Sequence, residues 1–185
     1  MKLLQVEREV RGWLEVMVVG EGLCPFAARP LREGLVRISV CAEGDMDGIY
    51  RYVLSEMERL INTSPQALET TLVAVPKGLE AFHDYLDMLD DLQDALRQLQ
   101  LEGVLQIASF HPDYVFDGEA KDDVSNFTNR SPCALFHLLR EETLSAVLEG
   151  HPNPQEIPER NQARMRELGL QGLESLFRRA REFQR

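Results

Sequence analysis

The stretch from Gln106 to Glu142 combines histidines, aspartates, asparagines, arginines and a cysteine between two apolar segments. Loops on a rigid scaffold are where binding and catalytic groups concentrate, and a domain does not need so many functional groups merely to turn a corner. We therefore expect the functional site in this stretch. Its candidate catalytic residues are His111, His137, Asp123 and Glu141.

The passage Asn129-Arg130-Ser131-Pro132 is typical of a helix start, because serine is a good N-cap and proline fits the first helical position. It predicts a helix from Ser131 to Glu149. The free N–H groups and positive dipole end of a first helical turn bind phosphate or carboxylate, and Arg130 would add a bidentate contact. The alternative is an ordinary capped helix with Arg130 in a structural salt bridge. The candidate substrate-binding residues are Asn126, Asn129, Arg130, Ser131, Arg140, Arg160 and Asn161.

Two histidines are the candidates for moving a proton, since an imidazole titrates near neutral pH. His137, Arg140 and Glu141 are spaced to share one face of the predicted helix, where a histidine and a glutamate form a base with its orienting partner. Ordinary pairing for helix stability is the alternative. His111 follows the third predicted strand, and strand ends are where sheets place reactive groups.

The acidic residues of the loop resemble a calcium-binding loop only superficially. Asp122 stands where such a loop needs its glycine, and Thr128 stands where it needs its closing glutamate. Solvated loop acids are the better interpretation, with Asp123 as a local cap or as a partner that orients a histidine. We assign no metal ligand, and the cofactor remains open.

Cys24 begins the passage Cys24-Pro25-Phe26-Ala27, which looks like half of a redox motif with alanine in place of the resolving cysteine. A lone thiol acts as a nucleophile where a nearby histidine or arginine lowers its pKa, and a buried structural cysteine is the alternative. Arg160 and Asn161 stand at another predicted helix start. They would form a second side of the anion site or belong to a capped surface helix.

The periodicity of apolar residues predicts an α/β fold, or a two-layer α+β fold, because strands alternate with helices. The small sheet has three predicted strands, near residues 35–41, 70–75 and 104–110. About six helices pack around it. They are predicted at residues 3–19, 45–61, 79–101, 131–149 and 158–168, with a last amphipathic helix that contains Leu173 to Phe183.

The composition sets limits on partners and location. The chain has 185 residues, which suits one domain over residues 1–185, and a net charge of -11. This acidic protein repels phosphate backbones and anionic lipid, so nucleic acid and membrane partners are disfavoured. We find no apolar run of the roughly 20 residues that a membrane helix needs. Three cysteines without a secretory signal predict a cytoplasmic protein.

Several passages spread over nearly the whole chain resemble one protein family. The chain is similar to the uncharacterised family known as domain of unknown function 1415, which implies a cytoplasmic, single-domain protein of bacterial type and lends no activity. One departure is Cys133-Ala134, where the family more often has an aromatic residue and then proline. The matching passages are residues 23–27, 69–72, 106–112, 126 with 128–132, 137–141, and 157–158 with 160–161.

Three hypotheses of function follow. The first is an enzyme that acts on a small anionic molecule, bearing phosphate or carboxylate, held by Arg130 and the helix start, with His111 or His137 as acid and base. The second is a non-catalytic metabolite sensor that uses the same pocket. The third is a monothiol enzyme built on Cys24. The oligomeric state is left open.

Overall fold

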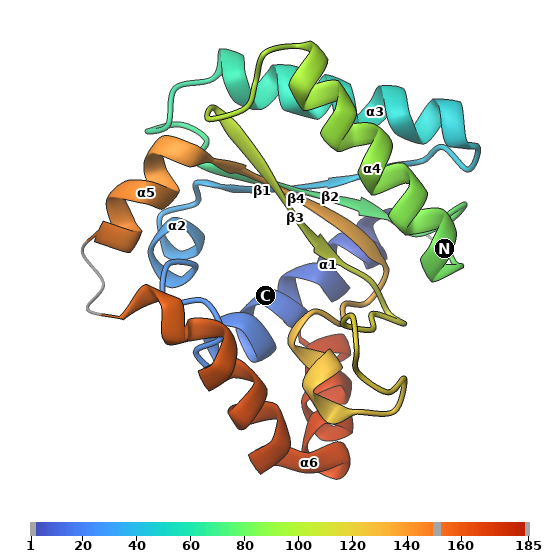
Figure 1. Cartoon of the computed structure of the whole chain (residues 1–185), viewed down its shortest axis with the longest axis vertical. Coiled ribbons are helices and arrows are strands. Elements are labelled where there is room, and N and C mark those ends of the chain that lie inside the picture. Colours follow the sequence, from blue (N-terminus) through green and yellow to red (C-terminus); the bar gives the residue numbers. More distant parts are fainter. Residues whose placement is uncertain (1–2, 150–152, 184–185) are drawn as a thin grey trace.

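A computed structural model of the chain describes residues 3–149 and 153–183. Its centre is a mixed sheet with helices on both faces (Figure 1). The strands are β1 (Val36–Val40), β2 (Thr70–Val75), β3 (Leu105–Phe110) and β4 (Ala134–Arg140), in the order β1-β2-β4-β3. The α/β class is confirmed, and so are the three predicted strands.

The fourth strand, β4, corrects the helix predicted from Ser131 to Glu149. β4 lies antiparallel between β2 and β3, so that both of its edges are hydrogen-bonded. Ala134, Leu135, Phe136 and Leu138 are buried, because a central strand is covered on both faces. Such a strand is a continuous apolar run without alternation, which sequence periodicity does not separate from a buried helix. The three-stranded sheet of the sequence prediction is therefore a four-stranded sheet.

Two of the helices cover one face of the sheet (Figure 1). Helix α3 (Met46–Asn62) begins after Asp45, whose carboxylate accepts a hydrogen bond from Gly48 N at 2.9 Å, and α4 (Phe82–Gln98) packs beside it. Their apolar faces form one core with the side chains of β2 and β4 that point the same way, among them Val73 and Phe136. The alternation of strands and helices that the sequence predicts is seen here, since α3 lies between β1 and β2 in the chain and α4 lies between β2 and β3.

The other face is covered by the two ends of the chain. Helix α1 (Leu3–Trp13) continues through a π-helical turn, η1 (Leu14–Val19), and packs against α6 (Ile157–Arg181). Helix α6 is kinked at Gly169, whose positive φ of 61° interrupts the helix, so two predicted helices become one bent element. The second core lies here, with Leu72 of β2 and Leu135 of β4 facing it.

Two short helices complete the second face. They are α2 (Ala28–Arg32), which follows the Cys24 turn, and α5 (Glu141–Glu149), which follows β4 directly. Between β3 and β4 the long loop contains a 3₁₀ turn, η2 (Val124–Thr128), that packs on α6. No helix within the described part of the chain is long and apolar enough to cross a membrane.

Candidate functional site

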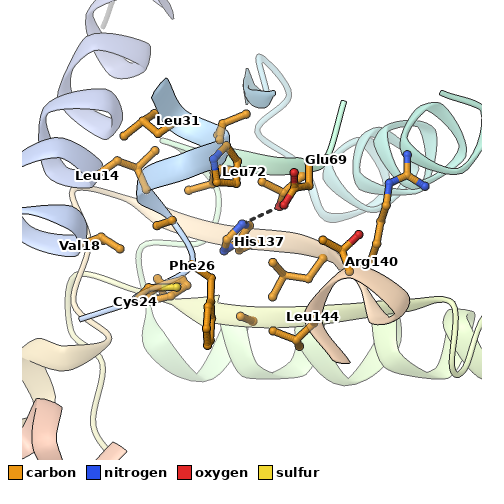
Figure 2. Close-up of a pocket in the computed structure, with 18 of the residues that line it drawn as sticks. Leu14, Val18, Cys24, Phe26, Leu31, Glu69, Leu72, His137, Arg140 and Leu144 are labelled. Carbon is orange, nitrogen blue, oxygen red and sulfur yellow. Dashed lines mark hydrogen bonds between the residues drawn. The ribbon is translucent and has the colours of Figure 1, made fainter. Parts of the chain in front are cut away.

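A pocket of about 200 Å³ opens on the face of the sheet that α1 and α6 cover (Figure 2). Its floor is the sheet, and its walls come from η1, the Cys24 turn, α2 and α5. The lining is mostly apolar and includes Leu14, Val18, Phe26, Leu31, Leu72, Ala108, Phe110, Leu139 and Leu144. Polar groups enter it at Cys24, Glu69, Thr70, His137, Arg140 and Thr143.

His137 lies at the centre of the pocket floor, because β4 places it between Leu72 of β2 and Ala108 of β3 (Figure 2). Its Nε2 lies 2.7 Å from the Thr70 hydroxyl, and that hydroxyl donates to Leu138 O at 2.6 Å. A hydroxyl has one hydrogen, so Thr70 accepts from Nε2–H, and no hydrogen bond among the described residues reaches the lone pair of His137 Nδ1. Burial lowers the pKa of His137 to about 4, and the imidazole is neutral at pH 7.

Cys24 lines the same pocket from the turn between η1 and α2. Burial raises the pKa of its thiol above the ordinary value, and backbone hydrogen bonds from Phe26 and Ala27 partly offset this by lowering the pKa. The thiol is therefore protonated at neutral pH. Of the sequence candidates, His137 and Cys24 are the two whose reactive atoms belong to the pocket.

The Cys24 turn is held in place by the start of α6. Asn161 donates from Nδ2 to Leu23 O at 2.7 Å, and Arg160 donates to Gly22 O at 3.2 Å. Asn161 is buried, so its amide is one of the contacts that bind the two ends of the chain together. Arg160 and Asn161, which we expected to contact an anion, are thus positioning residues for the thiol.

Arg140 also lines the pocket, but its charge is directed elsewhere. Its guanidinium donates to the carbonyl oxygens of Leu60, Thr63 and Leu68, where it caps the C-terminal end of α3. Figure 2 shows the group turned away from the pocket. At the rim, Glu69 accepts a hydrogen bond at 2.5 Å from Arg29, so this pair joins α2 to the start of β2.

His111 lies outside the pocket and is fully hydrogen-bonded. Its Nδ1 accepts from Asp113 N at 3.0 Å, which leaves Nε2 to donate to Leu79 O at 3.0 Å. The ring is buried and packs against Phe82 and Tyr85. Burial lowers its pKa as well. This histidine fixes the start of the long loop, and it is not among the residues that line the pocket with His137.

The remaining polar candidates of the long loop bind backbone atoms of the loop and of β3. Asn126 accepts from Phe116 N and donates to Ala120 O, while Asn129 donates to Ser109 O. The Asp123 carboxylate accepts from Ser125 N at 2.7 Å and begins η2, so it caps this turn and contacts no histidine within the described part of the chain. These contacts explain the polar density of the loop by its need for backbone partners.

Arg130 and Ser131 precede a strand, so the predicted helix dipole is absent at Ser131. The Ser131 hydroxyl donates to Cys133 O at 2.6 Å. Arg130 donates to Tyr114 O and Lys121 O. Glu141 starts α5, and because β4 and not a helix carries His137, the two residues do not share a helical face. Among the described residues no three His, Cys, Asp or Glu side chains come together as a metal site.

The residues that sequence reasoning missed are mainly apolar. Leu14 and Val18 form a wall of the pocket, and Thr70 fixes the His137 tautomer. A signal for the wall is present, since residues 16–19 form the unbroken apolar run Val-Met-Val-Val where a surface helix would alternate with polar residues. The pairing of Thr70 with β4 has no such signal.

Fold and pocket together define an α/β protein with a small, largely apolar binding pocket on one face of a mixed sheet. The model of the family described as "Protein of unknown function (DUF1415)" matches residues 5–175. The chain belongs to this family, as the resemblance of its passages predicts. Neither the curated proteins nor the solved structures that were compared with the chain contain a match.

Proposed function

We propose that this protein binds a small, neutral, largely apolar organic molecule in the sheet-face pocket, through a hydrogen-bond donor that meets His137 Nδ1. The observation that carries the proposal is a neutral imidazole with a free lone pair in an apolar pocket. Small-molecule sites combine apolar walls with a few placed polar groups that fix the orientation of the ligand. A ligand hydroxyl or N–H would satisfy the lone pair that the protein leaves open.

The volume of the pocket limits the size of the ligand. An apolar cavity of about 150 Å³ accommodates benzene. The pocket here has about 200 Å³, which suits a single ring, or a branched chain of similar size, with one short substituent. The ligand is thus a molecule of about ten non-hydrogen atoms or fewer.

The charges around the pocket favour a neutral ligand over the anionic substrate that the sequence suggests. The Arg140 guanidinium caps α3, and Arg29 pairs with Glu69 and Glu33. Within the described residues no cation turns toward the pocket, so an anion there would lose its hydration without a partner, and burying an unpaired charge is costly. We therefore do not place the anionic ligand that the sequence suggests in this pocket, and we assign anion binding to another part of the molecule.

A series of three ring compounds tests the proposal. Phenol has a ring and a donor, benzene lacks the donor, and benzoate carries a charge. We expect phenol to bind more tightly than benzene by about 5- to 10-fold, because a net hydrogen bond contributes about 1 kcal/mol. We expect benzoate to bind most weakly. The measurement is the change in backbone amide NMR shifts at pH 7 as each compound is added.

His137→Leu provides the matched control, since it keeps the apolar lining and removes the acceptor. In this variant the preference for phenol over benzene should disappear while benzene binding persists. The proposal fails if neither phenol nor benzene shifts resonances of the pocket residues at millimolar concentration. It also fails if benzoate binds in the pocket more tightly than phenol does.

A second candidate function is thiol chemistry at Cys24, favoured by its position in the same pocket as a neutral histidine. A base that takes the S–H proton would let the sulfur attack an electrophilic carbon of a bound ligand and expel its leaving group. We expect iodoacetamide to alkylate Cys24 and saturating phenol to slow that alkylation at least 5-fold. The measurement is mass spectrometry of the labelled thiols, with Cys24→Ala as control. Alkylation at an unchanged rate in phenol would place the reactive thiol outside the ligand site.

A further inference from the structure

A second hollow, of about 440 Å³, lies between the long loop and the last turns of α6. Three arginines line it, Arg130 from the loop and Arg178 and Arg181 from the helix. The hollow is separate from the sheet-face pocket, with which it shares no lining residue. The other lining residues are Pro112, Phe127, Ser131, Pro132, Glu174 and Phe177.

The three arginines give the hollow a positive charge inside an acidic chain. Within residues 3–149 and 153–183, none of them forms an ion pair with a carboxylate. Glu174 also lines the hollow, which leaves the lining with two more positive than negative side chains. The whole chain has a net charge of -11, so the positive charge of this hollow is opposite in sign to the net charge of the protein.

Arg130 is held in a fixed orientation at the hollow. Its Nη2 donates to Lys121 O at 2.8 Å, its Nε lies 3.4 Å from Tyr114 O, and its guanidinium lies over the Phe127 ring at 4.5 Å. These contacts use two of the five N–H donors of the group and leave Nη1 without a contact of this kind. Less conformational entropy is lost when a ligand binds such a preorganised group.

The two helix arginines have a simpler explanation when each is taken alone. Cations near the C-terminal end of a helix interact favourably with its dipole, and Arg178, Arg179 and Arg181 all lie in the last turn of α6. That explanation does not account for Arg130, which reaches the hollow from a loop far away in the sequence. Nor does it explain why Arg178 and Arg181 line the hollow while Arg179 does not.

We propose that this hollow binds a doubly charged oxyanion, namely the phosphate group of a small phosphorylated molecule. Guanidinium groups match the oxygens of a phosphate in fork-like, bidentate contacts. A phosphate monoester carries a charge of about -1.5 to -2 at pH 7, which balances the excess of two cations. The proposal is independent of the ligand of the sheet-face pocket.

Titration with phosphate tests this site directly. Inorganic phosphate and phenyl phosphate are added to the full chain at constant ionic strength, and binding is followed by isothermal titration calorimetry. Arg178→Ala and Arg181→Ala should each weaken binding about 10-fold, because a hydrogen bond to a charged group contributes about 1.5 kcal/mol or more. Both side chains are exposed, and we expect both variants to fold.

Arg179→Ala is the matched control, since this residue carries the same charge on the same turn and does not line the hollow. It should change the affinity by less than about 2-fold, as expected for a screened surface charge. Equal weakening by Arg179→Ala and Arg178→Ala would show general electrostatic attraction and overturn the site. Calorimetric titrations that detect no phosphate binding, or binding equal to that of chloride, would overturn it as well.

Discussion

The hydroxyl of Thr70 determines what His137 offers to a ligand. Because this hydroxyl donates to Leu138 O, it can only accept from His137, and the proton of the ring is fixed on Nε2. The other ring nitrogen then faces the pocket as an acceptor, and burial keeps it unprotonated at neutral pH. One hydroxyl on a neighbouring strand thus turns a histidine into a neutral acceptor.

The low pKa of His137 predicts a stability loss in mild acid. Its folded-state pKa is about 4, below the unfolded value of about 6.5, so below pH 6.5 the unfolded chain takes up a proton that the folded chain does not. Stability should fall as the pH decreases from 6.5 to 4, by up to about 3 kcal/mol from this residue. Urea unfolding at a series of pH values measures the loss.

His137→Gln serves as the comparison, because glutamine keeps a polar side chain and does not titrate. Its unfolding free energy should depend less on pH between 6.5 and 4 than that of the parent. His111, whose pKa is also lowered by burial, remains in both proteins and contributes equally. If the unfolding free energies of parent and variant depend equally on pH in this range, the pKa of His137 is not lowered in the folded protein.

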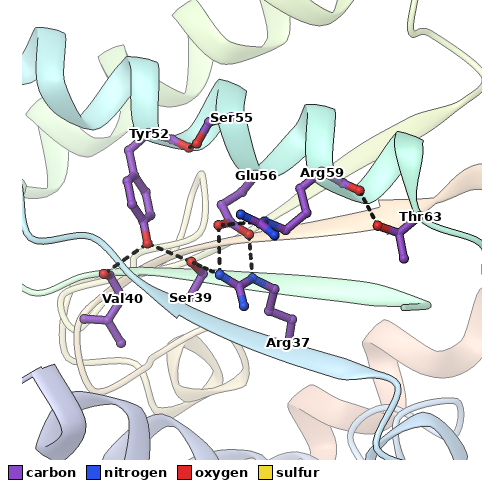
Figure 3. A network of polar contacts seen from close by, with 8 residues as sticks. All are labelled: Arg37, Ser39, Val40, Tyr52, Ser55, Glu56, Arg59 and Thr63. Atoms are coloured by element: carbon purple, nitrogen blue, oxygen red, sulfur yellow. Dashed lines mark hydrogen bonds and ion pairs between the residues drawn. The ribbon is translucent and has the colours of Figure 1, made fainter. Parts of the chain in front are cut away.

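At the scale of elements, a partly buried ion pair joins β1 to α3 (Figure 3). Arg37 of β1 donates from Nε and Nη2 to both oxygens of Glu56 on α3, at 2.8 and 3.1 Å. Glu56 is 3% exposed, whereas the Arg37 side chain is 39% exposed. Ser39 and Tyr52 extend the network to Val40 O, and Arg59 approaches Glu56 at 3.5 Å. The network therefore fixes the packing of α3 on an edge strand.

The unequal exposure of the pair predicts unequal mutational effects. Arg37→Met leaves the Glu56 carboxylate buried with only Ser39 and Arg59 as partners, and it should cost about 3 kcal/mol of unfolding free energy. Glu56→Gln leaves Arg37 able to reach water, and it should cost less, about 1 kcal/mol. Equilibrium unfolding in urea at pH 7 distinguishes the two, and equal losses would contradict this account of the pair.

A low pH should also weaken the network around Glu56. This loss of stability should occur at lower pH than the loss that His137 causes. Burial raises the pKa of Glu56, but hydrogen bonds from Arg37 and Ser39 and the charges of Arg37 and Arg59 lower it more, so the net direction is downward from 4.5. A depressed carboxyl pKa gives stability that is present above 4.5 and is lost as the pH falls through the folded value. Glu56→Gln should therefore flatten the stability profile only below about pH 4.5.

The helices and strands also show which parts of the fold could be predicted from the sequence. Strands β1, β2 and β3 and helices α3 and α4 follow from periodicity and capping, as at Asp45. Strand β4 does not, because its apolar run is paired on both edges and Ser131-Pro132 imitates a helix start. Misplacing β4 also misplaced the site, since a helical His137 would face Glu141, whereas the strand turns it to Thr70. Such pairings depend on which strands become neighbours, which local spacing does not encode.

At the scale of the whole molecule, the functional groups separate into two regions. The sheet-face pocket is largely apolar and contains Cys24 and His137, while the hollow beside α6 is basic and contains Arg130. Sequence reasoning places Arg130 and His137 in one site, because it cannot show that the long loop carries Arg130 to the last turns of α6. Helix α6 contributes to both regions, since its start holds the Cys24 turn and its end lines the hollow.

The central claim is that His137 Nδ1 is the acceptor for a neutral ligand, and its nitrogen resonances test this directly. The ¹⁵N shifts of both ring nitrogens are recorded at pH 7 without and with saturating phenol. We predict that Nε2 is protonated in both states and that Nδ1 is unprotonated. On adding phenol, the Nδ1 shift should move in the direction of an accepted hydrogen bond and the Nε2 shift should stay in place. A proton on Nδ1 in the free protein, or bound phenol that leaves the Nδ1 shift unchanged, would contradict the claim.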